Sequence, residues 1–332
     1  MARLKSLLVV ALAALAALAA LGAIGPVHAQ DAASYPSRPI RIVIPFPPGG
    51  ATDLITRKIG EKLTQKWGQP VVVENKPGAN TIIGTETVAR ADPDGYTILM
   101  TAPAGLLQLP ALMAKLPYDP EKDFLPLTQI AEVPTALIVP VDVPAKSVRE
   151  LGDYVRANPG KTSYASLGLA ATQHIYGEAL KRAFKGDSTH VPYKGDAPAM
   201  TDLVAGRVQY MFNNPVSAIN FAKQGRVRIL AVTGEQLLPG LPDVPTMAQA
   251  GIPGFEVVGW FSFFVHSKTP RAIAEKLHAE LSSIIRSPEM SDFLRERGTI
   301  PTGIGLEEFA RKMALERRAW ARLIKDNDIR LE

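Results

Sequence analysis

The sequence contains no cysteine among its 332 residues. Disulfide bonds and thiolate metal ligands are therefore excluded, and so is a lipid anchor attached through an acylated cysteine. The stability of the fold must come from a hydrophobic core. The hydrophobic fraction of 46% and the charged fraction of 21% are ordinary for a globular protein.

The sequence also has few histidines and only a small net charge. The five histidines, at positions 28, 174, 190, 266 and 278, show no H-E-x-x-H or other metal spacing, so we expect neither a metal nor another cofactor. Without Arg3 and Lys5 the 37 basic residues become 35, which against 32 acidic residues lowers the formal net charge from +5 to +3. This mild balance does not favour nucleic acid as a partner.

The N-terminal stretch is typical of an export signal. Arg3 and Lys5 precede an uncharged apolar run over residues 7–23, and Val27-His28-Ala29 places small residues where a signal peptidase cleaves. The pattern predicts a signal peptide over residues 1–29, cleaved near Ala29, and a mature protein in the periplasm. The alternative is an uncleaved anchor helix, which the short, alanine-rich run disfavours.

A stretch near the start of the mature chain organises the rest. The apolar run 42–44 predicts a buried strand, and the prolines after it end that strand. Gly49-Gly50 permits a tight turn, and Thr52 or Asp53 can cap the helix that follows. Free N–H groups and the helix dipole at such a turn favour an anion, although an ordinary βα loop is the alternative. Neither the P-loop nor the dinucleotide fingerprint is present, so nucleotide binding is not expected.

Strands alternate with helices along the chain, which predicts an α/β protein with parallel, doubly wound sheets. Extended stretches at 124–140 and 255–265 predict two crossings between domains, as in a hinged clamp. We expect domain 1 at residues 30–131 and 255–332, and domain 2 at residues 132–254. Ligands bind beyond the carboxyl ends of strands in such sheets, so Phe46–Asp53 and Thr101–Gly105 should face one crevice.

The second expected domain repeats the design of the first turn. A strand at 162–166 leads through a small-residue turn into a helix at 172–184, which predicts a second anion site. Ser166 and Gly168 form half of a nucleophile elbow, but Tyr164 stands where that motif needs glycine. An exported hydrolase that uses Ser166 and His174 is therefore a second hypothesis beside a binding protein without catalytic activity.

Six motifs are spread over the mature chain: Tyr35–Ile40, Pro45–Asp53, Val73–Ala79, Asp92–Tyr96, His190–Gly195 and Leu241–Thr246. Their order and residues resemble the periplasmic solute receptors of tripartite tricarboxylate transporters, the Bug-type family. The resemblance covers essentially all of the mature chain. It implies a two-domain periplasmic-binding-protein (Venus flytrap) fold that captures a small organic carboxylate and delivers it to membrane permease subunits.

The resemblance also implies where the ligand binds. In that family the loops matching Phe46–Asp53 and Ser166–His174 hold the ligand through backbone amides, hydroxyls and water. We expect a dicarboxylate or an aromatic carboxylate as ligand, and a monomeric receptor; a ligand sensor for a membrane kinase would need the same clamp. The expected ligand-binding residues are Phe46, Gly50, Ala51, Thr52, Asp53, Ala102, Ser166, Gly168, Ala171, Thr172, His174 and Asn213.

Departures from the family pattern at four positions limit this transfer. Ala170 replaces the second glycine of the family's second loop, and Ala171 replaces its hydroxyl residue. Gln209 and Asn213 stand where the family commonly has aspartate. We expect the missing carboxylate at Asn213 to weaken selection for a ligand amino group. We also expect that a β-branched residue at Gly50 damages both ligand affinity and the fold.

Overall fold

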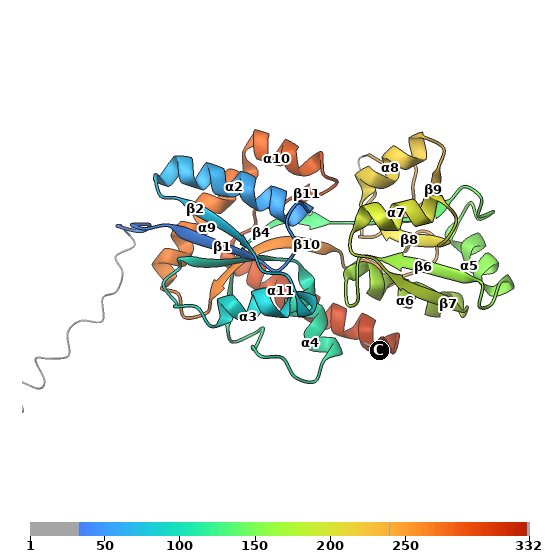
Figure 1. Cartoon of the computed structure of the whole chain (residues 1–332), viewed down its shortest axis with the longest axis horizontal. Helices are drawn as coiled ribbons and strands as arrows, with labels where there is room; N and C mark the ends of the chain where they lie inside the picture. The colour runs from blue at the N-terminus through green and yellow to red at the C-terminus, as the bar shows by residue number, and fades with distance from the viewer. Residues whose placement is uncertain (1–32, 239, 331–332) are drawn as a thin grey trace, which may run out of the picture. The chain divides into compact units, whose positions relative to one another are not determined.

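Apolar strands, most of them followed by a helix, build two β-sheets, so the predicted α/β class is confirmed. The structure, a computed structural model, describes residues 33–238 and 240–330. The predicted signal peptide over residues 1–29 and its cleavage point lie outside the described residues. Each sheet gathers its own helices, which gives a two-domain fold (Figure 1).

The first sheet has six strands in the order β11-β4-β10-β3-β1-β2. Strand β1 lies parallel to both β2 and β3, with Ile42 opposite Val73 on one side and Ile98 on the other. Ile42 and Ile98 are fully buried, as expected of a strand covered on both faces. The strands are β1 (Ile40–Ile44), β2 (Val71–Asn75), β3 (Thr97–Thr101), β4 (Phe124–Val133), β10 (Gly259–His266) and β11 (Ile300–Pro301).

The second sheet has five strands in the order β7-β6-β8-β5-β9. Strand β6 lies parallel to β7 and β8, with Tyr164 opposite His190 on one side and Tyr210 on the other. The strands are β5 (Ala136–Pro140), β6 (Thr162–Ser166), β7 (Ser188–Pro192), β8 (Tyr210–Asn213) and β9 (Val227–Val232).

Helices cover both faces of each sheet (Figure 1). Around the first sheet they are α2 (Ala51–Trp67), η1 (Ala79–Thr81), α3 (Ile82–Ala89), the π-helix η2 (Ala104–Gln108), α4 (Leu109–Leu112), α9 (Arg271–Arg286), α10 (Pro288–Arg295) and α11 (Leu306–Asp326). Around the second sheet they are α5 (Val148–Ala157), α6 (Thr172–Phe184), α7 (Asp196–Val204) and α8 (Pro215–Lys223).

Two crossings connect the sheets, as the extended stretches predicted. Strand β4 ends at Val133 and β5 begins at Ala136, while the return path runs from the end of β9 to the start of β10 at Gly259. Two buried threonines tie the crossings together. The Thr233 N–H donates to the Thr135 carbonyl at 2.8 Å, and the Thr135 N–H donates to Thr233 Oγ1 at 2.9 Å.

Both sheets are mixed, which corrects the prediction of parallel sheets. Strand β10 runs antiparallel to β3 and β4, and β5 runs antiparallel to β8 and β9. The reason lies in the crossings. Ala136, the first residue of β5, pairs with Asn213, the last residue of β8. Strands β5 and β10 each follow a crossing, so each enters its sheet at the carboxyl ends of the parallel strands. Each therefore runs in the direction opposite to those strands.

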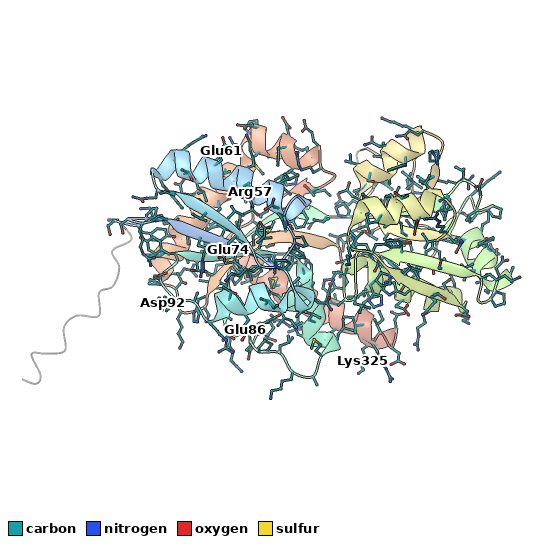
Figure 2. The ribbon with its side chains drawn as sticks, viewed as in Figure 1. Arg57, Glu61, Glu74, Glu86, Asp92 and Lys325 are labelled. Atoms are coloured by element: carbon teal, nitrogen blue, oxygen red, sulfur yellow. The ribbon has the colours of Figure 1, made fainter. Side chains whose placement is uncertain are left out.

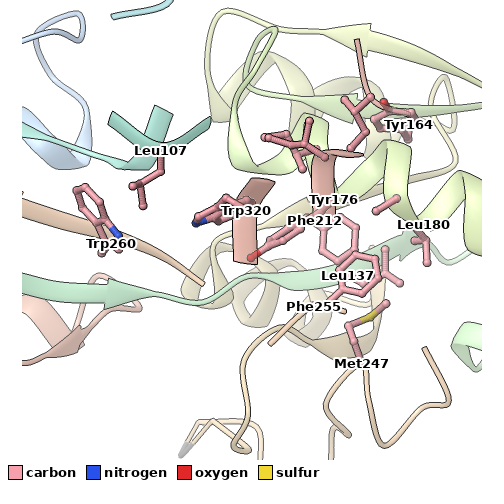
Figure 3. Close-up of a cluster of buried hydrophobic side chains, with 14 of the residues drawn as sticks. Leu107, Leu137, Tyr164, Tyr176, Leu180, Phe212, Met247, Phe255, Trp260 and Trp320 are labelled. Atoms are coloured by element: carbon pink, nitrogen blue, oxygen red, sulfur yellow. The ribbon is translucent and has the colours of Figure 1, made fainter. Parts of the chain in front are cut away.

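A buried aromatic cluster links the two sheets through the last helix. Trp320 of α11 stacks on Tyr176 of α6 with ring centroids 5.7 Å apart. Phe212 and Phe255 also pack against Tyr176, at 5.2 and 5.4 Å. Figure 3 shows Trp320 between Leu107 and Tyr176. Aromatic pairs of this kind add about 0.5–1.5 kcal/mol each beyond the area they bury, so α11 stabilises the region where the sheets meet.

A buried carboxylate lies beside this cluster. Glu316 of α11 accepts a hydrogen bond from Trp260 Nε1 at 2.6 Å, and Lys312 Nζ lies 3.8 Å from its other oxygen. Burial raises the pKa of Glu316 to about 7, and the Lys312 charge opposes that rise. Burial therefore favours the protonated, neutral form of Glu316 relative to an exposed glutamate.

The charged side chains that Figure 2 labels lie apart, on α2, β2, α3, α11 and the loop before β3, rather than in one patch. Many surface charges are paired with a neighbour of opposite sign, such as Arg90 with Glu86 at 2.7 Å. Over the described ranges, no helix is long and apolar enough to span a bilayer.

Candidate functional site

The expected ligand residues gather at one point in each sheet. From β1 the chain moves to β2 on one side and then returns to β3 on the other, so the strand order reverses between β1 and β3. The same reversal occurs between β6 and β8 in the second sheet. In open α/β sheets, ligands bind beyond the carboxyl ends of strands at these reversals. Phe46–Asp53 and Ala102 follow β1 and β3, and Ser166–His174 and Asn213 follow or end β6 and β8.

In the first turn, the helix start is open. Gly50 is the N-cap of α2 with φ −78° and ψ 175°, and no side chain caps it. The prediction that Thr52 or Asp53 caps this helix is therefore wrong. The positive φ of 86° is at Gly49. A side chain at Gly50 would meet open space, so the expectation that a β-branched residue there damages the fold is also wrong.

Asp53 braces the first turn instead of capping the helix. Its Oδ2 accepts from the Gly49 N–H at 3.0 Å, while its Oδ1 accepts from Arg57 Nε at 3.0 Å. Asp53 is only 4% exposed, and the bonds from Arg57 hold its pKa below the ordinary 3.8. Because Arg57 neutralises this carboxylate, the brace does not place an uncompensated negative charge beside the helix start.

The rest of the first turn is tied to β2. Asn75 Nδ2 donates to the Phe46 carbonyl at 3.1 Å, and Arg57 donates to Asn75 Oδ1 at 2.9 Å. Ala51 is exposed beside Gly50, whereas Thr52 is buried. The exposed part of this turn is therefore Pro47–Ala51, whose side chains carry no polar group.

The second turn repeats this arrangement with a different brace. Ala171 is the N-cap of α6, again without a side-chain cap. Gly168 has φ 126°, and Ala170, which replaces a family glycine, has φ 56°. His174 is 4% exposed, and its Nδ1 accepts from the Ala170 N–H at 3.2 Å. The imidazole thus holds the turn that leads into α6.

Ser166 and His174 do not form the pair that the hydrolase hypothesis requires. Ser166 Oγ lies 2.6 Å from His190 Nε2, and the His190 ring stacks on His174 with centroids 4.1 Å apart. The Ser166 hydroxyl also donates to the Gly168 carbonyl at 3.0 Å. Burial, followed by the neighbouring His174, lowers the pKa of His190 to about 4, so this brace is neutral at pH 7. Ser166 is 0% exposed and has no surface to offer a substrate.

Asn213 is turned into the second sheet rather than outward. It is 2% exposed, and its Nδ2 contacts Met200 Sδ at 2.8 Å. A carboxylate nevertheless lies nearby. Ser217 Oγ is 3.4 Å from Asn213 Nδ2 and donates a hydrogen bond to Asp196 Oδ2 at 3.2 Å. Burial raises the pKa of Asp196. The missing carboxylate at Asn213 therefore does not leave this edge without an acidic group, which weakens the argument against an amino ligand.

Gln108, which the sequence did not predict as a site residue, connects the segment after β3 to the second turn. Gln108, at the end of η2 after β3, donates from its Nε2 to Thr172 Oγ1 at 2.9 Å. Thr172 begins α6, so this bond brings the β3 side of the first sheet to the second turn. The available signal was a single polar residue inside the apolar run 106–109.

A separate hollow of about 440 Å³ lies around Arg38, Arg41 and Arg90, at the opposite end of β1 and β3. Each of these arginines already has an acidic partner: Asp94, Glu74 and Glu86 respectively. The hollow thus offers little unpaired charge to an anion.

The two helix starts are suited to an anion. An α-helix leaves its first N–H groups without an intrahelical partner and carries roughly half a positive charge at that end. At α2 and α6 no side chain takes these groups. The starts of α3, α7, α9 and α11 also lack a side-chain cap, so the position at a strand-order reversal is what distinguishes α2 and α6. Within the described ranges, no cluster of three or more histidine, aspartate or glutamate side chains is arranged to hold a metal.

The chain is similar to known proteins over most of its length. A UPF0065 protein of Pseudomonas sp. (strain P51) is 40% identical over 297 residues, which cover 89% of this chain and 88% of that protein. A solved structure of an R. palustris protein with adipate is 33% identical and has a TM-score of 0.80; the match covers 89% of this chain and 98% of that protein. MatC from Rhodopseudomonas palustris with bound malate is 31% identical, covers 87% and 100%, and has a TM-score of 0.78.

The sequence profile of one family, described as "Tripartite tricarboxylate transporter family receptor", matches residues 55–329. The match spans the second sheet with its turn and the first sheet from β2 onward; β1 and the first turn precede it. The resemblance drawn from the six motifs is therefore confirmed: this chain belongs to the receptor family of the tripartite tricarboxylate transporters.

Proposed function

We propose that this protein is a periplasmic receptor that binds a small dicarboxylate between the carboxyl edges of its two sheets and passes it to the membrane subunits of a tripartite tricarboxylate transporter. In this proposal residues 1–29 are a cleaved signal peptide. Domain 1 comprises residues 30–131 and 255–332, domain 2 comprises residues 132–254, and the receptor is a monomer. The ligand contacts come from the exposed parts of the two turns.

The observation that carries the proposal is the pair of uncapped helix starts at the strand-order reversals. Gly50 and Ala171 are both N-caps without a side-chain hydrogen bond, and each follows the central parallel strand of its sheet. Two partial positive charges of about one half suit two carboxylates of one ligand. The solved relatives with adipate and with malate support a dicarboxylate over an aromatic monocarboxylate.

We propose no catalytic role. The Ser166 hydroxyl is bonded to His190 and Gly168 and is buried, so it braces the turn. His174 accepts a backbone N–H and is not free to act as a general base on Ser166.

The test is a binding panel on the protein without residues 1–29. Adipate, malate, succinate, benzoate, aspartate and citrate are each added in thermal unfolding scans, and positive results are followed by calorimetry. A dicarboxylate at a hundredfold excess over its Kd should stabilise the fold by about 2.7 kcal/mol. Absence of stabilisation by every dicarboxylate would overturn the proposal. Tighter binding of aspartate than of any acid without an amino group would show that the ligand class is amino acids.

A further inference from the structure

Gln108 is a fully buried polar side chain placed among apolar neighbours. It is 0% exposed, as is Leu109, and Leu107 is 1% exposed. Its Nε2 donates to Thr172 Oγ1 at 2.9 Å, and its Oε1 has no hydrogen-bond partner among the described residues. A buried amide with half of its hydrogen-bonding capacity unused destabilises the fold. Packing alone would therefore favour an apolar residue of the same size at this position.

The hydrogen bond to Thr172 decides what that hydroxyl can do. A threonine hydroxyl has one hydrogen to donate and an oxygen that accepts. Because Gln108 Nε2 donates to this oxygen, the hydroxyl hydrogen is turned away from Gln108 and is available to another acceptor. Thr172 is partly exposed and is the first residue of α6, so this donor lies beside the free N–H groups of the helix start.

A set of donors recognises one chemical class. An ionised carboxylate only accepts hydrogen bonds, whereas an ammonium group only donates them. A helix start with free N–H groups and a threonine hydroxyl fixed as a donor therefore favours a carboxylate. The location in a π-helix fits this role, since π-turns inside helices occur frequently at functional sites.

We propose that Gln108 is a positioning residue for ligand selection: it fixes the Thr172 hydroxyl as a hydrogen-bond donor, so that the turn before α6 selects a carboxylate group. This inference rests on the proposed function, because it assumes that a carboxylate of the ligand meets the start of α6.

The first test is a double-mutant cycle read out by calorimetric Kd values for adipate and malate. We expect Thr172→Val to raise the Kd about ten- to hundredfold, because a bond to a charged group is lost. Gln108→Met should raise it about three- to tenfold in the unaltered protein and less than about twofold when Thr172 is already valine. The control is Gln129→Met, which replaces another fully buried glutamine, whose side-chain amide has no hydrogen-bond partner among the described residues, and should leave the Kd within about twofold.

The second test uses Gln108→Glu, which keeps the shape of the side chain. An ionised carboxylate at position 108 accepts the Thr172 hydrogen, whereas its protonated form donates as the amide does. Measured at each pH as a ratio to the unaltered protein, the Kd of this variant should be raised at least about tenfold near pH 8. The ratio should fall toward one as the pH decreases to about 5.5, because burial favours the protonated form.

The outcomes are separable. Equal effects of Gln108→Met with and without the Thr172 hydroxyl would show that Gln108 acts through packing and would overturn the inference. Unchanged binding by Gln108→Glu near pH 8 would show that the amide oxygen faces Thr172, which also overturns it. Failure of the unaltered protein to bind adipate, malate or succinate would overturn the proposed function itself, and this inference with it.

Discussion

The two ligand turns have the same outline but are held by different chemistry. In the first turn a buried carboxylate, Asp53, holds the Gly49 N–H and is neutralised by Arg57. In the second turn the imidazole of His174 accepts the Ala170 N–H, and a second histidine, His190, whose pKa burial lowers to about 4, holds Ser166. A strand, a tight turn and an uncapped helix therefore do not determine the brace. What the two turns share is a helix start without a side-chain cap, which is the part that the proposed ligand would meet.

The difference has an electrostatic consequence. A charged brace beside an anion site requires its own counter-ion, and Arg57 supplies it at 2.9 Å. The neutral His190 in the second turn needs no counter-ion, but its contribution depends on the imidazole staying uncharged. We therefore expect the two turns to respond to acid in different pH ranges.

The largest expected effect concerns His190. Its folded pKa of about 4 lies below the ordinary 6.5, so the unfolded chain binds a proton before the folded protein does. The contribution of His190 to the free energy of unfolding is therefore fully present above about pH 6.5 and is lost as the pH falls toward 4. The loss is at most about 3 kcal/mol at 1.36 kcal/mol per pKa unit. Urea unfolding at several pH values, compared between the unaltered protein and His190→Gln, measures it.

Two other groups separate this effect from the rest of the protein. Glu316, whose folded pKa is raised to about 7, acts in the opposite direction and loses stability as the pH rises from 4.5 to 7, so only the difference between variants is informative. Asp53 has a lowered pKa, so its contribution is present above 3.8 and is lost at lower pH. If His190→Gln and the unaltered protein keep a constant difference from pH 7 to pH 4, the neutral-brace account is wrong.

The next effect is on ligand binding and contrasts the two threonines. Thr172 is partly exposed and has its hydroxyl oriented by Gln108, whereas Thr52 is buried within α2. Thr172→Val should weaken binding of adipate or malate about tenfold or more, and Thr52→Val less than about threefold. Calorimetry measures both variants against the same ligand. Equal losses would mean that both hydroxyls contact the ligand, as the sequence alone suggested.

The contrast between the turns also shows what a sequence can predict here. Strand, turn and helix at both sites follow from local patterns, namely an apolar run, small residues and an amphipathic segment, so their positions were predicted well. The direction of β5 and β10 was missed, because it depends on where the chain re-enters a sheet after a crossing. No local sequence pattern indicates where in the sheet the chain re-enters.

The geometry of the candidate site was predicted in part, for the same reason. Both turns were identified, but side-chain partners far apart in the chain were not. Ser166 is bonded to His190 rather than to His174, and Gln108 reaches Thr172 across 64 positions. A polar residue inside an apolar run marks Gln108 as unusual, but only the packed structure shows its partner.

A smaller effect tests the charged brace. Asp53→Asn keeps an oxygen for the Gly49 N–H but loses the charge that Arg57 binds. We expect the unfolding free energy to fall by about 1–2 kcal/mol, less than for a fully buried pair because Arg57 is half exposed. The matched control is Glu61→Gln, which removes an exposed acid from the same helix and should change stability by less than about 0.5 kcal/mol. Equal effects of the two variants would show that Asp53 does not brace the turn.

The smallest effect compares the two positive φ angles. Gly49 has φ 86° and Ala170 has φ 56°, a conformation that disfavours any residue with a Cβ atom by roughly 1–2 kcal/mol. Since glycine also gains about 0.4–1 kcal/mol of freedom in the unfolded chain, Gly49→Ala should destabilise the fold by about 1 kcal/mol. Ala170→Gly should stabilise it by about 0.5 kcal/mol.

The control is Gly50→Ala, whose φ of −78° and open surroundings accept a methyl group, so it should be neutral or slightly stabilising. Urea midpoints without ligand measure all three. A destabilised Ala170→Gly variant would mean that the methyl group of this fully buried alanine contributes more to packing than its backbone strain removes, and the second turn would then depend on packing where the first depends on glycine.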